Sequence, residues 1–422
     1  MKRWAGLFIV LATVAAACGG STATTITTTT TAPSPEPVSL AATPGLNRAD
    51  PAADAPVAEV VAGLNDAGFA LLRTHGAAEN LVLSPASVGH ALLMARGAAD
   101  DVTAAAIDEA LQLPPGDDAD RGWNAIDFAM ARSAEDEDQV TLTIADRIWP
   151  RTDVQPNQAW IDGLTAHHGV TIETLDFAGD PDGSRDIINE WISDETEELI
   201  PELLPQDFVT PATVLVLTDA VYFKAQWQTE FGKYQPTAGA FTRLDGTTVD
   251  VEFMRELELG GPRGAGDGFV AAEIPYIGGD FSMLLIVPEF GRFEDIRSRL
   301  DQATLDDIDG TLVTGPYELL MPKWTTTTAL DLLPWLSNIG AEPGAYPGIA
   351  PEAFLGAAVH GADIAVDEQG TVAAAATAFA FLESGPPEPE LTVAADRPFL
   401  YLIRHSETGL VLFVGQVTDP TQ

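Results

Sequence analysis

The stretch HGADIAVDEQGTVAAAATAFAFLESGPPEPE, from His360 to Glu390, decides the fold. Its first part places apolar Ile364 and Val366 between acidic residues, and this alternation with period two predicts a strand. Every residue from Gly370 to Ala378 is then small or short, and an apolar tip and several prolines close the segment. About twenty residues of this kind are too long for an ordinary connection, so they indicate either disorder or a functional loop.

Two structures fit the alanine run inside this stretch. Alanine has the highest helical propensity, so the run could be a simple helix. The small side chains would equally allow the segment to enter a crowded sheet as an additional strand without overpacking. Composition alone leaves both open.

An acidic residue followed by Gly, Thr and an alanine-rich run resembles the hinge and reactive-centre loop of the serpins. Other strings that resemble the family follow in its order between Val57 and Pro420: NLVLSPAS at 80–87, INEWISDETEELI at 188–200, LVLTDAVYFKAQW at 215–227, IPYIGGDFSMLLIVP at 274–288, MPKW at 321–324 and DRPFLYLIRHSETGLVLFVGQVTDP at 396–420. Because they occur in order over nearly the whole chain, we identify it as resembling this family throughout.

The resemblance implies a single serpin domain over residues 57–421, as a monomer. Strands and helices occur without regular βαβ alternation, which is typical of the α+β class. We expect a helix from Val57, a second around Val88–Met94, strands at 140–148, 214–223 and 281–287, and a core hairpin that turns at Ser406–Gly409. The resemblance adds three β-sheets, about nine helices and an exposed reactive-centre loop at about 368–390.

For function, the resemblance implies an irreversible suicide-substrate inhibitor of serine proteases. The protease would attack the loop, and the freed hinge would then insert into the main sheet. The hinge residues would be Glu368, Gly370, Thr371, Ala373, Ala374, Ala375 and Ala376. Side chains alternate along a strand, so insertion would bury Thr371, Ala373, Ala375, Thr377, Phe379 and Phe381 on one face. None of these is charged or proline, which favours an inhibitor over the alternative, a non-inhibitory serpin that binds or stores.

The position of the scissile bond remains open between neighbouring residues. The usual family spacing, counted from Glu368, places it at Ser384–Gly385 and favours an elastase-like or subtilisin-like protease. If the scissile bond lies one residue earlier, it is Glu383–Ser384, and the protease would recognise Glu383. If it lies two residues earlier, it is Leu382–Glu383, and the protease would recognise Leu382. These alternatives would suit glutamate-specific and chymotrypsin-like proteases.

An enzyme is the rival class. The sequence contains neither a G-x-S-x-G elbow nor an H-E-x-x-H helix. Ser84, Asn189 and His360 could be imagined as a nucleophile with its base and orienting group. The resemblance instead implies that Ser84, Ser87, Asn189 and His360 form a hydrogen-bonded cluster beneath the main sheet. We expect no catalytic residue, cofactor or metal site, and we interpret the isolated pair His167–His168 as a surface feature.

The charge balance argues against nucleic acids and other polyanions as partners. With 63 acidic and 21 basic residues, the formal net charge is −42. So acidic a surface repels nucleic acids and anionic membranes, and the region that binds heparin in some serpins is acidic here. We expect neither nucleic-acid binding nor activation by heparin.

The N-terminal region predicts export. Basic Lys2 and Arg3 precede an apolar stretch too short to span a bilayer comfortably, as in a signal peptide over residues 1–17. The single cysteine, Cys18, follows AAA and precedes GG, which resembles a bacterial lipoprotein signal. Residues 18–56 are rich in Thr and Pro, and we expect a disordered stalk that holds the domain at the cell surface through the lipid. The alternative is secretion in soluble form.

Overall fold

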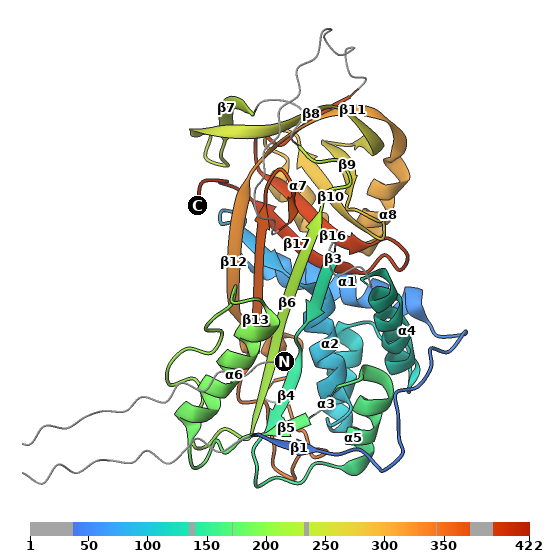
Figure 1. Ribbon diagram of the computed structural model, residues 1–422, viewed down its shortest axis with the longest axis vertical. Helices are drawn as coiled ribbons and strands as arrows, with labels where there is room; N and C mark the ends of the chain where they lie inside the picture. The colour runs from blue at the N-terminus through green and yellow to red at the C-terminus, as the bar shows by residue number, and fades with distance from the viewer. Residues whose placement is uncertain (1–36, 135–139, 171, 232–235, 343, 372–390) are drawn as a thin grey trace, which may run out of the picture. The chain divides into compact units, whose positions relative to one another are not determined.

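Three β-sheets organise the part of the chain that is described, which covers residues 37–134, 140–170, 172–231, 236–342, 344–371 and 391–422. The structure is a computed structural model, and Figure 1 shows the sheets with their helices. Nine α-helices and one π-helical turn accompany the sheets in these residues. The expected α+β class with three sheets and about nine helices is confirmed.

The six-stranded sheet contains the segment that decided the fold. Its order is β12-β13-β14-β6-β3, and β4 also pairs with β6. In Figure 1, β12, β13 and β6 lie beside one another through the middle of the structure. The strands are β3 (Val140–Ile144), β4 (Arg147–Pro150), β6 (Leu215–Gln226), β12 (Trp324–Asp331), β13 (Ala358–Val366) and β14 (Gly370–Thr371). The single strand expected at 140–148 is therefore two strands, and Ala145 and Asp146 lie at the break.

The nine-stranded sheet forms the upper half in Figure 1 and includes the predicted core hairpin, β16–β17. A small two-stranded sheet pairs β1 with β5. The remaining strands are β1 (Val38–Leu40), β2 (Leu81–Leu83), β5 (Ile172–Thr174), β7 (Thr237–Thr242), β8 (Thr248–Gly266), β9 (Phe269–Pro275), β10 (Phe281–Pro288), β11 (Val313–Pro322), β15 (Thr392–Ala394), β16 (Phe399–His405) and β17 (Val411–Val417).

The helices begin where local capping favours them. The first helix starts at Val57 as predicted. The second starts earlier than expected because the Ser84 side chain accepts a hydrogen bond from the Ser87 amide and Pro85 occupies the first turn. The helices are α1 (Val57–Thr74), α2 (Pro85–Arg96), α3 (Asp101–Ala110), α4 (Asp118–Ser133), α5 (Gln158–Gly163), the π-helical η1 (Leu164–His168), α6 (Pro181–Glu195), α7 (Phe293–Arg299), α8 (Gln302–Thr311) and α9 (Leu333–Asn338).

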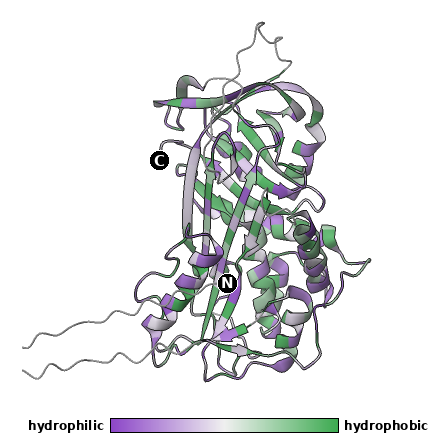
Figure 2. Cartoon of the chain, viewed as in Figure 1, coloured by the Kyte–Doolittle hydropathy of each residue, from purple (hydrophilic) through white to green (hydrophobic). Residues whose placement is uncertain are grey.

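The two faces of the six-stranded sheet pack against different cores. The main core includes α1, α2 and the nine-stranded sheet. A smaller core joins α6 to the other face through Ile188, Ile192, Val216, Ala220 and Val359. Figure 2 shows apolar residues along the central strands and hydrophilic ones on α4 and α6. Side chains of neighbouring residues on β13 therefore face separate environments, because they alternate across the sheet.

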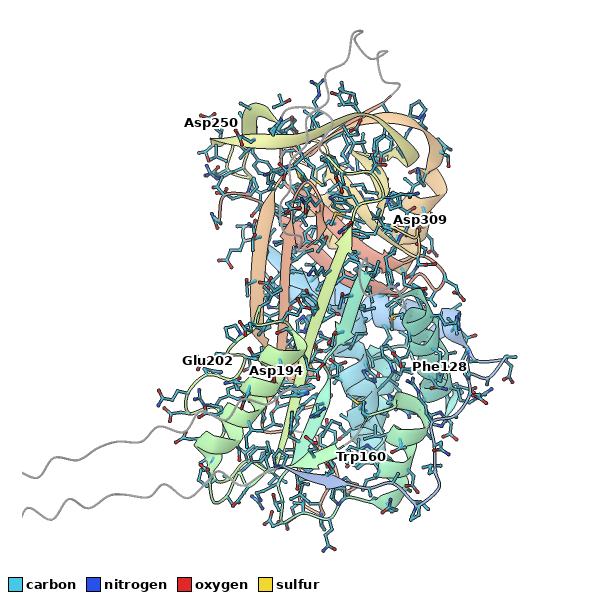
Figure 3. All side chains as sticks on the ribbon, in the orientation of Figure 1. Phe128, Trp160, Asp194, Glu202, Asp250 and Asp309 are labelled. Atoms are coloured by element: carbon cyan, nitrogen blue, oxygen red, sulfur yellow. The ribbon has the colours of Figure 1, made fainter. Side chains whose placement is uncertain are left out.

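The predicted stalk needs a correction at its C-terminal end. Residues from Val38 to Leu40 form β1 and pair antiparallel with β5. Arg48 donates to the Asn124 side chain at 2.9 Å. Its guanidinium lies 4.5 Å from the ring of Phe128 on α4, a residue that Figure 3 labels. Residues 37–56 are thus part of the folded unit, because their backbone and one arginine find partners that composition does not reveal.

The export signal, Cys18 and the rest of the predicted stalk lie outside the described residues. Among the residues that are described, no helix is both long and apolar enough to cross a bilayer.

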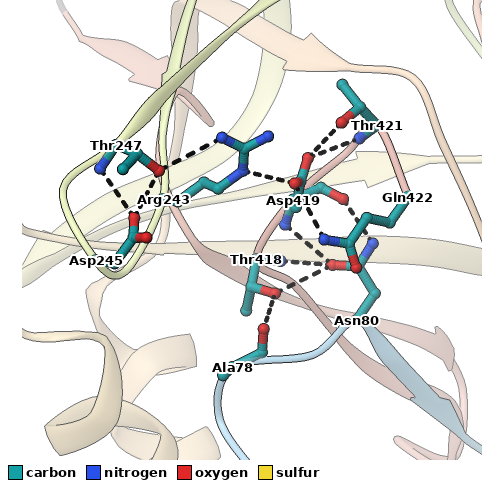
Figure 4. Close-up of polar contacts among 9 residues, drawn as sticks. All are labelled: Ala78, Asn80, Arg243, Asp245, Thr247, Thr418, Asp419, Thr421 and Gln422. Carbon is teal, nitrogen blue, oxygen red and sulfur yellow. Dashed lines mark hydrogen bonds and ion pairs between the residues drawn. The ribbon is translucent and has the colours of Figure 1, made fainter.

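A polar network holds the C-terminus against the start of β2 (Figure 4). The Asn80 side chain accepts from the amides of Thr418 and Asp419, and it donates to the Asp419 carbonyl at 2.7 Å. Arg243 donates to the Asp419 carboxylate at 2.6 Å. Burial opposes ionisation of Asp419, but hydrogen bonds from Thr421 and Arg243 outweigh it and lower the pKa to about 2. The folded state therefore prefers ionised Asp419.

We predict that Asp419→Asn lowers the free energy of unfolding by about 1 to 3 kcal/mol at pH 7, because Arg243 loses a charged partner. The pKa is depressed on folding, so the stabilisation is present above the unfolded value near 4 and is lost as the pH falls towards 2. Urea unfolding of both proteins at several pH values measures this. Asp250→Asn makes the same chemical change at an exposed position of β8 and is the control, which should leave the midpoint nearly unchanged. A constant difference between wild type and Asp419→Asn down to pH 2 would contradict the assignment.

Candidate functional site

The candidate site is the seam between β13 and β6 in the six-stranded sheet. The two strands pair in parallel only along Ala358–Ala362 and Leu217–Val221. His360 lies directly opposite Asp219 in this register. Beyond Ala362 the strands part, and β14 lies between them. The seam is therefore closed at one end and occupied by another strand at the other.

The predicted hinge is the strand that fills the open end. Gly370 is opposite Gln226 and Thr371 is opposite Ala225 on β6, while Thr371 also pairs with Val366 on β13. Both pairings are antiparallel. Two residues of the hinge are therefore already strand residues within the sheet.

The Thr371 side chain is buried, with 1% exposure. Its hydroxyl lies 2.7 Å from the Tyr276 hydroxyl. The Tyr276 ring stacks on Trp227 with centroids 4.5 Å apart, and burial raises the pKa of Tyr276 far above its ordinary value. Since neither hydroxyl ionises near neutral pH, the contact is a neutral hydrogen bond within an aromatic environment.

Glycine is required at position 370 by a close backbone approach. A Cβ added there would lie 2.0 Å from the Ala225 carbonyl oxygen. The turn before it is held by the Asp367 carboxylate, which accepts from the Gln369 amide at 2.8 Å. Trp227 donates its backbone N–H to the Gln369 carbonyl, and the indole N–H donates to the Asp367 carbonyl.

Glu368 pairs with Lys323 at 2.6 Å. The predicted hinge residues Ala373, Ala374, Ala375 and Ala376 and the reactive-bond residues Leu382, Glu383, Ser384 and Gly385 lie outside the described residues. The described chain resumes at Leu391, whose carbonyl accepts from the Glu318 amide on β11. Residues 372–390 thus connect two different sheets.

Beneath the seam, three of the predicted cluster residues come together. The Ser84 backbone N–H donates to His360 Nε2 at 3.1 Å, so this nitrogen carries no proton. His360 Nδ1 therefore carries the proton and donates to Asp219 Oδ1 at 2.6 Å. Both side chains have 0% exposure. Ser84 directs its amide rather than its hydroxyl to the imidazole, which is not the geometry of an activated nucleophile.

Ser87 extends the cluster to residues that the sequence reasoning missed. Its hydroxyl lies 2.6 Å from Asp146 Oδ1 and also contacts Asp219 Oδ1. Burial raises the pKa of Asp146 well above its usual range, and the nearby Asp219 carboxylate raises it further. The available signal was an acidic residue inside each of two apolar strings, TLTIADRIW and LVLTDAVYF.

The fourth predicted residue, Asn189, does not join this cluster in the described structure. It lies on α6 and bonds the backbone of Leu203 and Leu204 instead. A Cβ added at Gly361 would lie 2.7 Å from the Leu203 side chain, so this segment packs on the face opposite His360. The prediction of one shared cluster was wrong because alternation on β13 separates the two groups.

His168 also differs from expectation. Its side chain is buried, with Nδ1 3.1 Å from His90 Nε2 and Nε2 3.0 Å from Asp120. Desolvation, with the nearby His168 and Arg48, lowers the pKa of His90 well below its ordinary value. No group of three or more His, Cys, Asp or Glu side chains in the described residues has the arrangement of a metal site.

Comparison with known proteins identifies the family to which the chain belongs. The model of the family described as serpin, serine protease inhibitor, matches residues 62–420. The chain belongs to the serpin family.

Relatives of this serpin are distant in sequence. An uncharacterized serpin-like protein of Methanosarcina acetivorans is 30% identical over 67% of this chain and 68% of its own. Plasminogen activator inhibitor 1 of Sus scrofa is 30% identical over 66% of this chain and 72% of its own. The native structure of tengpin, a thermophilic serpin, superposes with a TM-score of 0.78 over 88% of this chain and 97% of tengpin, at 23% identity. The tengpin likeness supports the fold.

We predict that Gly370→Ala displaces β14 from the seam of this serpin, because the methyl group would overlap the Ala225 carbonyl. Hydrogen–deuterium exchange should show at least tenfold faster exchange of the Trp227 amide, which loses the Gln369 carbonyl. Gly356→Ala is the matched control, since its added methyl meets no atom within 4 Å. Unchanged protection of Trp227 in Gly370→Ala would show that the hinge does not depend on this close approach.

Proposed function

We propose that this serpin is an irreversible suicide-substrate inhibitor of serine proteases. The observation that carries the proposal is the seam, in which β14 already separates one end of β6 from β13. The hinge lies at the position where a longer strand would begin to insert. An inhibitor fits this arrangement better than an enzyme does, because the buried Ser84 and His360 are closed to a substrate.

In this mechanism the protease attacks the loop and becomes covalently attached as an acyl-enzyme. The loop then no longer connects β14 with Leu391, which is held on β11 in the other sheet. The freed segment extends β14 along the seam and carries the attached protease with it. Displacement of the protease distorts its active site before water completes hydrolysis.

The strand directions make insertion favourable. β6 and β13 are parallel to each other, while β14 is antiparallel to both. Extension of β14 would replace one short parallel ladder with two antiparallel ladders, which are slightly more stable per residue. About ten new hydrogen bonds at about 0.5 to 1.5 kcal/mol each supply on the order of ten kcal/mol. The native state is therefore held by a kinetic barrier, which includes the His360–Asp219 contact.

The sequence around Ser384–Gly385 favours an elastase-like or subtilisin-like target. Export with a lipid on Cys18 would place the inhibitor at the cell surface. The name of plasminogen activator inhibitor 1 describes an inhibitor among the relatives, which supports an inhibitory role here.

The direct test is to mix the full-length protein with elastase, subtilisin and chymotrypsin and to look for a complex that survives SDS. N-terminal sequencing of the released peptide locates the cleaved bond. Cleavage without a stable complex in any mixture would favour the binding or storage alternative.

We predict that Thr371→Arg converts the inhibitor into a substrate, with at least about a tenfold loss of SDS-stable complex. The position is 1% exposed, and a buried guanidinium without a paired charge is strongly disfavoured. Thr371→Ser keeps the hydroxyl that meets Tyr276 and serves as the matched control, with complex formation close to wild type. Stable complexes with Thr371→Arg at the wild-type level would contradict inhibition by insertion of the segment that follows β14.

A further inference from the structure

A line of hydrogen bonds runs from the seam to a cavity at the side of the domain. Its members come from five separate parts of the chain and lie in this order: Asp219 on β6, Ser87 on α2, Asp146 between β3 and β4, His90 on α2, His168 on η1 and Asp120 on α4. We call this set the relay. Its first member, Asp219, is the residue that holds His360 across the seam.

Hydrogen counting shows that the relay holds additional protons. It contains five contacts, and each needs one hydrogen. The Ser87 hydroxyl and two neutral imidazoles supply three of them when all three carboxyl groups are ionised. Two protons must therefore be added. The proton of His360 Nδ1 is not available, since the Ser84 amide fixes this tautomer and directs that proton to Asp219.

The first added proton belongs to Asp146. One hydroxyl hydrogen cannot lie on both short contacts of Ser87, so one of its two carboxyl partners must donate. Asp219 Oδ1 already accepts from His360, so we assign the donated hydrogen to Asp146 and direct the Ser87 hydrogen to Asp219. The raised pKa of Asp146 agrees with this assignment.

The second added proton lies at the outer end, between His168 and Asp120. With Asp146 donating to Ser87, its Oδ2 accepts from His90 Nδ1 at 2.9 Å. His90 Nε2 must then accept from His168, whose other nitrogen donates to Asp120. The His168–Asp120 contact therefore holds the second added proton, while His90 is neutral.

The outer end is open to solvent. His168 and Asp120 line a cavity of about 500 Å³ together with Trp160, which is labelled in Figure 3. The Asp120 side chain is 23% exposed, while Asp146 and Asp219 are fully buried. Protons can enter or leave through this cavity.

Charged and titratable groups surround the relay on every packed element. They are Arg48 in the N-terminal segment, His90 and Arg96 on α2, Asp117, Asp120 and Asp127 at or on α4, His167 and His168 on η1, Asp146 after β3, Asp219 on β6 and His360 on β13. Arg48 and Arg96 are each paired with a carboxylate, Asp127 and Asp108 respectively.

We propose that the relay is a proton-controlled lock on the β6–β13 seam, which is tight when Asp146 carries its proton and loosens when that proton is lost. An ionised Asp146 would face ionised Asp219 across a single hydroxyl, so one carboxylate would lose its hydrogen bond and the two charges would repel. The claim that the relay controls loop insertion rests on the proposed function. The claim that Asp146 carries a buried proton does not depend on that function.

The direction of the pH dependence follows from two groups. The folded pKa of Asp146 is raised, so its contribution is complete below the unfolded value near 4 and is lost as the pH rises towards the folded value. The folded pKa of His90 is lowered, so its contribution is present above about 6.5 and is lost as the pH falls. The two effects have opposite signs, and His90 offsets Asp146 only below about pH 6.5. Where Asp146 alone loses its proton, the lock weakens by up to about tenfold per pH unit.

The experiment compares wild type with Asp146→Asn, in which a permanently neutral amide replaces the carboxyl group. Difference infrared spectroscopy at pH 7 detects the C=O stretch of a protonated carboxyl, and we expect Asp146→Asn to lose one such band. Spontaneous insertion is followed by the loss of loop cleavage in limited proteolysis between pH 6.5 and 9. We expect the wild-type rate to rise with pH and the Asp146→Asn rate to stay flat.

Asp331→Asn is the matched control, because it makes the same chemical change at an exposed end of β12, where the side chain caps Leu333. It should keep both the band and the wild-type pH profile. If Asp146→Asn does not fold, wild type alone provides the test, since its carboxyl band must disappear over the pH range in which the rate rises.

Identical infrared bands in wild type and Asp146→Asn at pH 7 would overturn the relay. Loss of the band with an unchanged pH profile would overturn its control of the seam. A wild-type protein that has the band but forms no SDS-stable complex with any protease would leave the relay intact and overturn the proposed function instead.

Discussion

The hydrogen bond between His360 and Asp219 is the contact on which the central sheet depends. It joins the two strands that pair in parallel over only a few residues, and both side chains are fully buried. A buried charged hydrogen bond is costly to break when its partner remains unpaired. Any additional strand that enters the seam must nevertheless separate these residues. In the proposed mechanism, this contact would therefore form part of the barrier to insertion.

The predicted hinge lies at the end of the seam opposite the His360–Asp219 contact. Gly370 and Thr371 already lie between β6 and β13, and the Ala225 carbonyl leaves no room for a side chain at position 370. These two residues separate β6 from β13 at that end of the seam. At the other end, β6 and β13 pair with each other through Leu217–Val221 and Ala358–Ala362. The proposed mechanism adds a second arrangement, in which β14 continues between β6 and β13, while in the native one Leu391 is held on β11 in the other sheet. In that mechanism, cleavage of the loop would change the sheet because the two are continuous in the chain.

The sequence predicted the parts of this arrangement that depend on neighbouring residues. Alternation around Ile364 and Val366, the small hinge residues and the helix that starts at Val57 are local patterns, and the structure confirms the strand at 358–366 and the helix. The sequence could not predict the relay, because its members are far apart along the chain. Asp146 lies 59 positions from Ser87, and Asp219 lies 132 positions from it. Each acidic residue alone interrupts an apolar strand, and only the fold brings them to one hydroxyl. Asn189 was misplaced because motif order does not tell which face of a sheet a residue meets.

The most direct test of the account is a crystal structure of the protein after cleavage within residues 382–385. We expect β14 to continue as a strand along the seam, antiparallel to both neighbours. Pairing of Ala358–Ala362 with Leu217–Val221 should then be lost, and His360 and Asp219 should no longer be in contact. A cleaved protein in which β6 and β13 remain paired and His360 still bonds to Asp219 would contradict the account.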